Sequence, residues 1–364
     1  MATNKNQHFV PRAYLKAFSM DGQGAAISLF NVDHERFIPA APLKNQCSGD
    51  YFYGEDLRIE KSLQKVEGRY AELVREVTAP GYALTDSHRD FLRQFWLIQH
   101  LRTEAASMRM VEFAQKMRDT AGIEPNEFRL EVKEAVQHSI SVAIQYLPAV
   151  QDMKVCLLRN RTNEPFIASD DPAVLTNRWH LDSPASEGRS FGVGAAGSLF
   201  FLPITPKIQC VAYDGDVYSV AHERGWSEIR REVDVQAINQ QQILNCYANL
   251  YVHDKVHEPT VRAQFNRIKT LRPGAKHKAH YAVYDGTHNG SSTYRVIGGN
   301  EDPAQHERAL IHIETIHPRP SSWPVQIARR HNGAIFTNGT GLGFVRRMQL
   351  LAYGKESFKK LRPW

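Results

Sequence analysis

Apolar residues recur at helical spacing through most of the first 150 residues. Tyr14, Leu15 and Phe18 follow Pro11, which suits the start of a helix because its missing N–H would be unpaired there. Longer apolar stripes predict helices over 56–77, over 85–119 with Thr85 or Asp86 as the cap, and over 126–147. Between these helices the pattern favours short strands at 26–32, 36–38 and 51–53.

After Pro148 the pattern changes to short β-rich runs bounded by Asn, Gly, Pro and Asp. We expect strands at 154–158, 165–168, 199–203, 208–213 and 217–220, with Asp214-Gly215 as a hairpin turn between the last two. A Gln- and Asn-rich helix is predicted over 234–252. Because strands and helices do not alternate regularly, we predict an α+β fold, with a helical central region and a short-stranded antiparallel sheet.

The last quarter of the chain is predicted to be a small β-rich extension. The polar segment 267–278, with Pro273-Gly274 inside it, is the best candidate for a linker. Beyond it, Gly-rich turns separate expected strands at 280–284, 293–297, 310–316 and 334–337. The predicted organisation is therefore an α+β domain over 1–269 and an extension over 270–364.

Composition indicates a globular protein. The chain has 364 residues, of which 42% are apolar. It contains no apolar run of about 18 residues, so we expect no membrane-spanning helix, and its polar first seven residues do not resemble a secretory signal. The four cysteines show no C-x-x-C spacing and are expected to be reduced thiols, which favours a cytoplasmic location.

The net charge of +6 is unevenly distributed along the chain. Residues 1–269 contain 31 Lys/Arg and 33 Asp/Glu, whereas residues 270–364 contain 14 and 6. A basic region of this kind favours contact with nucleic acid or another polyanion. A solubilising surface is the alternative.

Two charged residues lie within the apolar stripes of the predicted helices. Glu67 follows Leu63 by four residues, and Arg102 follows Ile98 by four, so each shares a face with buried positions. An isolated buried charge is costly, so each must be paired or line a polar cavity. Glu67 and Arg102 either form a structural ion pair or contribute to a common site.

A second polar cluster follows the strand predicted at 165–168. Ser169, Asp170 and Asp171 precede Pro172, which is favourable turn chemistry. Alternatively, one of the carboxylates holds a divalent metal or polarises water. His8 precedes the first helix, whose positive end favours a neutral imidazole that can act as a base.

Another histidine pair has the spacing of metal ligands. His277 and His280 are three residues apart, as zinc ligands often are. No second pair of Cys or His residues is convincingly placed, so zinc is a weak candidate.

Several of these segments together resemble a known family. Gln7–Phe18 resembles the H-x-V-P-x-x-Y-L-x-x-F opening of the family called Domain of Unknown Function 4238. The similarity covers residues 5–255 and continues through Ile59-Glu60, Val66-Glu67, Phe95 to Arg102-Thr103, Phe166–Pro172, Leu202–Pro206 and Asn239–Asn245. The resemblance implies no activity. It does favour convergence of the polar residues discussed above, because they are the polar parts of the family's motifs.

The leading hypothesis is a hydrolase that acts on a phosphate-bearing substrate, with a nuclease of a defence or toxin system among the candidates. The cofactor is left open, with a divalent cation as the candidate. The alternative is a non-enzymatic module that binds nucleic acid or protein through residues 270–364. In the first hypothesis the catalytic residues are His8, Glu67, Arg102, Asp170 and Asp171, and the substrate contacts are Tyr14 and Ser169.

Overall fold

A five-stranded sheet, with strand order β11-β5-β9-β8-β7, forms the centre of the molecule. The computed structural model describes residues 5–288, 291–298, 301–354 and 357–364. β11 and β5 are parallel and the other neighbours are antiparallel. The predicted α+β class is therefore confirmed. The strands are β5 (Lys154–Asn160), β7 (Val174–Thr176), β8 (Leu199–Thr205), β9 (Ile208–Tyr213) and β11 (Trp226–Ile229).

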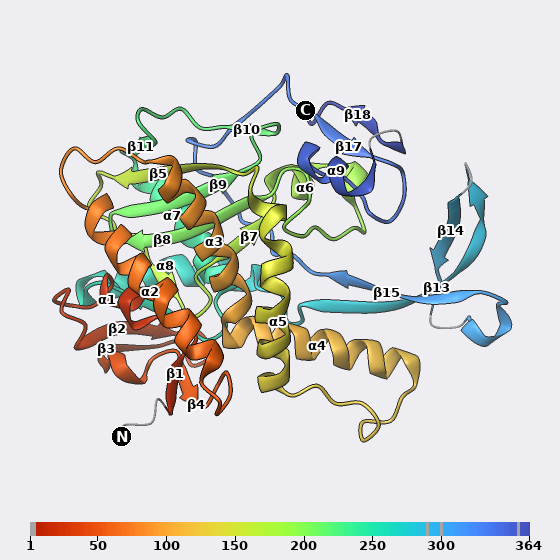
Figure 1. Cartoon of the computed structure of the whole chain (residues 1–364), viewed down its shortest axis with the longest axis horizontal. Coiled ribbons are helices and arrows are strands. Elements are labelled where there is room, and N and C mark those ends of the chain that lie inside the picture. Colours follow the sequence, from red (N-terminus) through yellow and green to blue (C-terminus); the bar gives the residue numbers. More distant parts are fainter. Residues whose placement is uncertain (1–4, 289–290, 299–300, 355–356) are drawn as a thin grey trace.

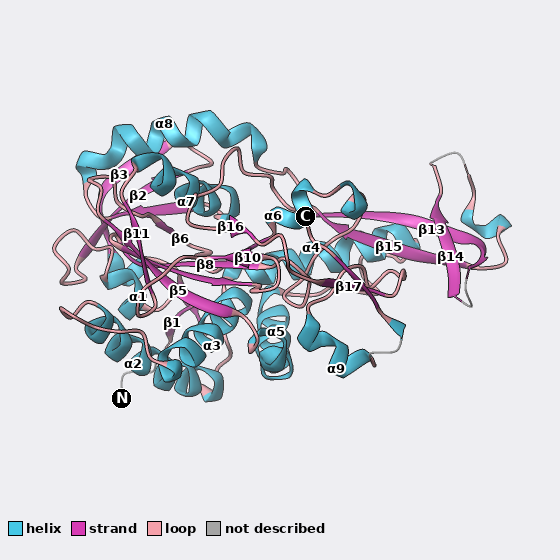
Figure 2. Cartoon of the chain, turned by 90° about the horizontal axis from the view of Figure 1, so that it is seen from above, coloured by secondary structure: helices cyan, strands magenta, loops and turns pink. Residues whose placement is uncertain are grey.

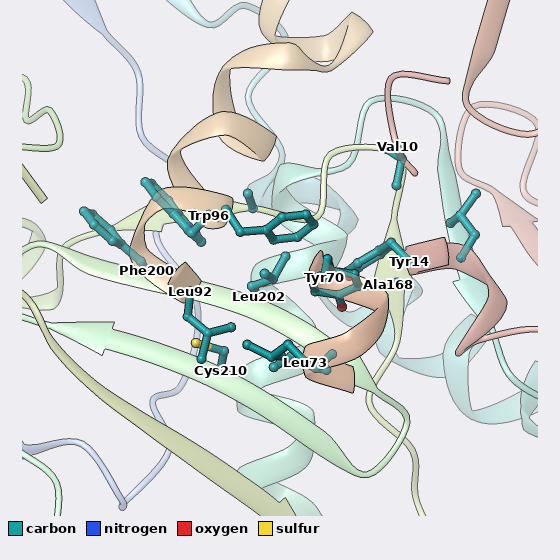
Figure 3. Packing of buried hydrophobic residues seen from close by; sticks show 14 of the residues in the cluster. Val10, Tyr14, Tyr70, Leu73, Leu92, Trp96, Ala168, Phe200, Leu202 and Cys210 are labelled. Carbon is teal, nitrogen blue, oxygen red and sulfur yellow. The ribbon is translucent and has the colours of Figure 1, made fainter. Parts of the chain in front are cut away.

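Helices lie on both sides of this sheet (Figures 1 and 2). Because successive residues of a strand point to opposite faces, Leu157 belongs to the core beneath α3 and Leu158 to the core beneath α7. On the α3 side, Trp96 stacks on Phe200 with ring centroids 3.8 Å apart (Figure 3). The helices are α1 (Arg12–Lys16), α2 (Arg58–Val77), α3 (Asp86–Arg102), α4 (Glu104–Ala121), α5 (Val132–Tyr146), α6 (Arg178–Asp182), α7 (Glu232–Asn245), α8 (Glu258–Ile268) and α9 (Leu350–Tyr353).

A second, four-stranded sheet packs beside the first and has the order β3-β2-β12-β6. All of its pairings are antiparallel. A short ladder of β1 with β4 ties the N-terminus to the same region. These strands are β1 (Asn6–His8), β2 (Ala26–Asn31), β3 (Arg36–Pro42), β4 (Ser48–Asp50), β6 (Ala168–Ser169) and β12 (Asn249–Val252).

The C-terminal segment first leaves the body and then returns to it. β13 (His277–His288), β14 (Ser291–Val296) and β15 (Ala309–Thr315) form a sheet that extends outward (Figure 1). The chain then packs back on the body, where the indole Nε1 of Trp364 donates to the carbonyl of Val217 over 3.1 Å. The division at residue 270 stays a prediction. The returning strands are β16 (Ala328–Arg329), paired with β10 (Tyr218–Ser219), and β17 (Ile335–Thr337), paired with β18 (Lys359–Leu361).

Three predicted elements of the N-terminal half differ from the structure. The expected strand at 51–53 is a turn, in which Tyr51 has a φ of 50°. The expected helix over 85–119 is two helices, because Thr103 adopts an extended conformation with ψ of 158° and caps α4 through the N–H of Ala106. The helix expected from 126 begins only at Val132, after a capping box of Glu131 and Glu134.

Two further predictions are wrong in the β-rich half. The helix expected over 234–252 ends at Asn245, and the remaining residues form β12. Asp214-Gly215 turns the chain but does not join a hairpin, because β9 already pairs with β5 and β8, and β10 pairs with β16. Local propensity indicated the turn at Asp214-Gly215, but tertiary partners decided which strands it joins and made residues 249–252 a strand.

Two predictions from composition can be compared with the structure. Within the described part of the chain, no helix combines the length and apolar character needed to cross a membrane. Cys47, Cys156, Cys210 and Cys246 are all buried free thiols.

Candidate functional site

Arg102 joins three segments of the N-terminal half. Its side chain is fully buried at the end of α3. Nη2 donates to Oε1 of Glu67 on α2 and to the carbonyl of His8 on β1, both over 2.7 Å, and Nε donates to the Tyr53 hydroxyl over 2.9 Å. The Glu67 side chain is 22% exposed, so it forms the ion pair with Arg102 from the solvent side. The arrangement holds β1, the turn at Tyr53 and two helices together.

The side chains of His8 and Tyr14 do not contribute to this group. His8 meets Arg102 only through its carbonyl, while its imidazole Nε2 lies 3.2 Å from the carbonyl of Lys44. Burial lowers the pKa of His8. Tyr14 is buried in the core against Tyr70, and within the described residues its hydroxyl has no hydrogen-bond partner. Neither side chain is placed to act on a substrate beside Arg102.

Asp171 is the centre of a second group, directly behind the break between α3 and α4. Its carboxylate is fully buried. The Thr103 hydroxyl donates to Oδ1 over 2.9 Å, the Asn245 amide donates to Oδ2 over 2.9 Å, and Arg109 of α4 forms an ion pair with Oδ2. Asp171 thus positions the Arg109 guanidinium and the end of α7.

Asp170 faces a different group of donors from its neighbour. Its Oδ1 accepts the N–H of Tyr247, and its Oδ2 accepts those of Ala248 and Asn249, at 2.7–2.8 Å. Burial raises the pKa of Asp170 to about 6, although the three N–H groups favour the ionised form. Both carboxylates of the turn are therefore saturated by protein donors, and this donor set does not fit a divalent cation.

We expect Asp170→Asn to lower the free energy of unfolding by about 2–3 kcal/mol, because an amide presents an NH₂ group to backbone donors that a carboxylate satisfies. Urea unfolding followed by circular dichroism measures the change. Asp254→Asn is the matched control, since this exposed carboxylate accepts the N–H of Val256 and asparagine caps equally well. A loss no larger than that of the control would contradict the structural role of Asp170.

A cavity of about 410 Å³ lies in front of these groups. Arg109 and Lys276 contribute cations to its wall, and no Asp or Glu of the described residues lines it. Lys276 is half-buried, and within the described chain its ammonium has no carboxylate partner. Burial, followed by the charges of Arg109 and Arg272, lowers its pKa. The cavity is therefore an electropositive site that is suited to an anion.

Burial favours the neutral form of three histidines in the wall. Nδ1 of His100 donates to the carbonyl of Ala173 over 2.8 Å, so the neutral ring keeps its lone pair on Nε2. Burial, followed by the charge of Arg109, lowers the pKa of His100 to about 4. Burial also lowers the pKa of His277, and it lowers that of His317 to about 3. His100 is the histidine among them whose free nitrogen is defined by a hydrogen bond from the ring to a carbonyl.

Five of the seven predicted site residues belong to two groups behind the cavity, and Tyr14 and Asp170 belong to neither. Arg102, Glu67 and the His8 main chain form one group, and Asp171 and Ser169 belong to the other. Ser169 donates to Gln242 over 2.8 Å. The two groups adjoin through the consecutive residues Arg102 and Thr103. The following predicted residues do not line the cavity: His8, Tyr14, Glu67, Arg102, Ser169, Asp170 and Asp171.

Sequence reasoning missed the residues that do line the cavity. His100 lies two residues before Arg102, off the apolar stripe, and Arg109 lies seven residues after Arg102, on α4. Asn245 was noted only as the end of a family motif. The spacing of His277 and His280 resembles that of metal ligands, but three residues along a strand place His280 on the opposite face of β13. In the described ranges, no three His, Cys, Asp or Glu residues are grouped to hold a metal ion.

Comparisons with known proteins bear on the family of the chain. Comparison with curated proteins and comparison with solved structures each gave no match. A family model described as "Protein of unknown function (DUF4238)" matches residues 6–256. The match includes His100, Arg109, Asp171 and Asn245, whereas Lys276, which lines the same cavity, lies beyond it. Because the model covers more than half of the chain, this protein belongs to the DUF4238 family.

Proposed function

We propose that the protein is a hydrolase that binds a phosphate-bearing substrate in the 410 Å³ cavity. The observation that carries this proposal is the combination of two cations, Arg109 and Lys276, with a neutral histidine, His100, in one cavity wall. A guanidinium and an ammonium match the charge of a phosphate group. A neutral imidazole supplies the base that water needs to become a nucleophile.

The proposed reaction is a direct attack of water on phosphorus. The water oxygen forms the new P–O bond, and its proton passes to Nε2 of His100. The bond to the leaving oxygen breaks, and that oxygen takes a proton from the Lys276 ammonium, whose pKa is lowered by burial. Arg109 offsets the charge on the non-bridging oxygens. His100 then releases its proton to solvent and Lys276 regains one.

The residues behind the cavity have positioning roles in this scheme. Asp171 fixes Arg109 through the ion pair and fixes Asn245 through a 2.9 Å hydrogen bond. Glu67 and Arg102 hold the end of α3, from which His100 projects. The sequence-based assignment of these residues to catalysis is thus replaced by a supporting role, and the base is His100 in place of His8.

We expect His100→Asn to reduce kcat by about 10²–10⁴-fold, because asparagine keeps a donor for the Ala173 carbonyl but lacks the basic nitrogen. Hydrolysis of bis(p-nitrophenyl) phosphate, p-nitrophenyl phosphate and single-stranded oligonucleotides measures the effect. The wild-type rate should fall at acidic pH as His100 becomes protonated near its pKa of about 4, and fall again at alkaline pH as Lys276 loses its proton at its lowered pKa.

The His100→Asn variant should not show this fall in rate at acidic pH, since the fall reflects protonation of the His100 imidazole. His138→Asn, an exposed histidine on α5, is the control and should behave like wild type. Equal turnover by the His100→Asn variant and the wild type would rule out the base assignment.

A non-enzymatic nucleic-acid-binding module is the second candidate. Residues 316–364 contain nine Lys/Arg and one Asp/Glu, so the basic excess belongs to the returning segment and not to the projecting strands. Lys359 and Lys360 of β18 are exposed there. Strongly salt-dependent binding of oligonucleotides, without hydrolysis of any phosphate ester in the same assays, would favour this candidate over the hydrolase.

A further inference from the structure

A second cavity, of about 420 Å³, lies on the other side of Arg109 and Lys276. These two residues and Asn245 line both cavities. The cations therefore stand between two hollows of nearly equal size. A phosphate held by Arg109 and Lys276 would have room for a substituent on each side.

The two cavities differ in the chemistry of their walls. The first contains flat aromatic surfaces: Phe191 and His317 stack with ring centroids 3.5 Å apart, and Phe113 meets His277 edge to face. Surfaces of this kind accept a planar base by stacking, which contributes about 1–3 kcal/mol per base.

The second cavity has a polar wall. Asp33, Glu112, Gln115 and Tyr247 line it together with Arg272. Oxygen and nitrogen groups of this kind suit a hydroxylated substituent, such as a sugar, because they offer both donors and acceptors. A phosphate monoester would leave this second cavity unfilled.

From this geometry we infer that the substrate is a nucleotidyl phosphodiester, bound with its phosphorus at Arg109 and Lys276, its base in the first cavity and its second nucleoside in the polar cavity. This inference deepens the proposed function and rests on it for the reaction, but not for the binding. The cavities are each of a size for one nucleoside, so the ligand is a dinucleotide or one unpaired strand. Base-paired DNA does not fit hollows of this volume.

The binding arm of the test uses a dinucleotide analogue in which both bridging oxygens of the diester are replaced by methylene, so that it is not hydrolysed. We expect it to bind at least about tenfold more tightly than thymidine 5′-monophosphate or inorganic phosphate, since it fills both cavities. Gln115→Trp, which fills the polar cavity from the exposed side of α4, should remove this preference and leave phosphate binding unchanged. Lys116→Trp, at the next position of the helix and outside both cavities, is the control.

The kinetic arm compares thymidine 5′-(p-nitrophenyl) phosphate with p-nitrophenyl phosphate. Gln115→Trp should lower kcat/KM for the diester by about tenfold and leave the monoester unaffected. A decanucleotide that competes better than the dinucleotide would identify a nucleic-acid strand as the source of the diester, and equal competition would identify a dinucleotide.

The outcomes separate this inference from the proposed function. Diester binding that Gln115→Trp abolishes, without any hydrolysis, would overturn the hydrolase and support the diester site. Hydrolysis of the monoester alone, or equal affinity for monoester and diester, would overturn the diester site and leave the hydrolase standing.

Discussion

Replacing Arg102 by methionine is expected to lower the free energy of unfolding by about 3 kcal/mol, because a fully buried guanidinium then no longer links three segments. The Tyr53 hydroxyl and the His8 carbonyl each lose a donor, and methionine provides no replacement. Glu67 contributes less to the loss, since its 22% exposure lets water reach the carboxylate. Denaturant unfolding at pH 7 measures the change.

Arg161→Met is the matched control for this substitution. Arg161 also pairs with a glutamate, Glu228, but the two side chains are 49% and 34% exposed, so the expected loss is below about 1 kcal/mol. A stable Arg102→Met variant that no longer hydrolyses substrate would contradict the structural role and return Arg102 to the reaction.

Lys276→Met is expected to have the opposite signature, with turnover lost and stability retained. The ammonium interacts with phosphate and protonates the leaving oxygen in the proposed scheme, so kcat/KM should fall by about 10²–10³-fold. Burial and the charges of Arg109 and Arg272 lower the pKa of Lys276. Because the pKa of Lys276 is lowered, its charged form is less favourable in the folded state than in the unfolded state. At pH 7 the free energy of unfolding should therefore stay the same or rise on removal of this charge.

The stability advantage of the variant has a defined pH dependence. In the wild-type protein, the charged Lys276 destabilises the folded state. This destabilisation decreases as the pH rises through the lowered folded-state pKa toward the unfolded value of 10.5. Parallel urea titrations at pH 7 and above should show the difference shrinking. Lys278→Met, an exposed lysine two residues further along and outside both cavities, is the control. Unchanged turnover in the Lys276→Met variant would exclude Lys276 from the reaction.

The sequence predicts the existence of the main helices better than their limits. Apolar periodicity indicated the helices around Leu63 and Ile98, because a buried face leaves a repeating pattern. It could not indicate the break at Thr103, where one hydroxyl caps α4 and also donates to Asp171, 68 residues away. That second bond is tertiary and leaves no local periodic signal.

The sequence also predicts part of the candidate site. A charge inside an apolar stripe must find a partner, and Arg102 and Glu67 are indeed in contact. The residues that line the cavity carry no such signal. His100, Arg109 and Lys276 lie on positions that a sequence pattern assigns to solvent, and only the fold places them around one space.

Arg272, between α8 and β13, links the start of the C-terminal segment to the polar cavity. Its guanidinium donates to the carbonyls of Ile243, Cys246 and Tyr247, and so covers the end of α7 just where Asn245 meets Asp171. A ligand that orders this corner thereby favours attachment of the segment after α8. Attachment of that segment must raise the affinity for the ligand by the same free energy, because coupling between two binding events is reciprocal. Ligand affinity and the packing of this corner are therefore expected to change together.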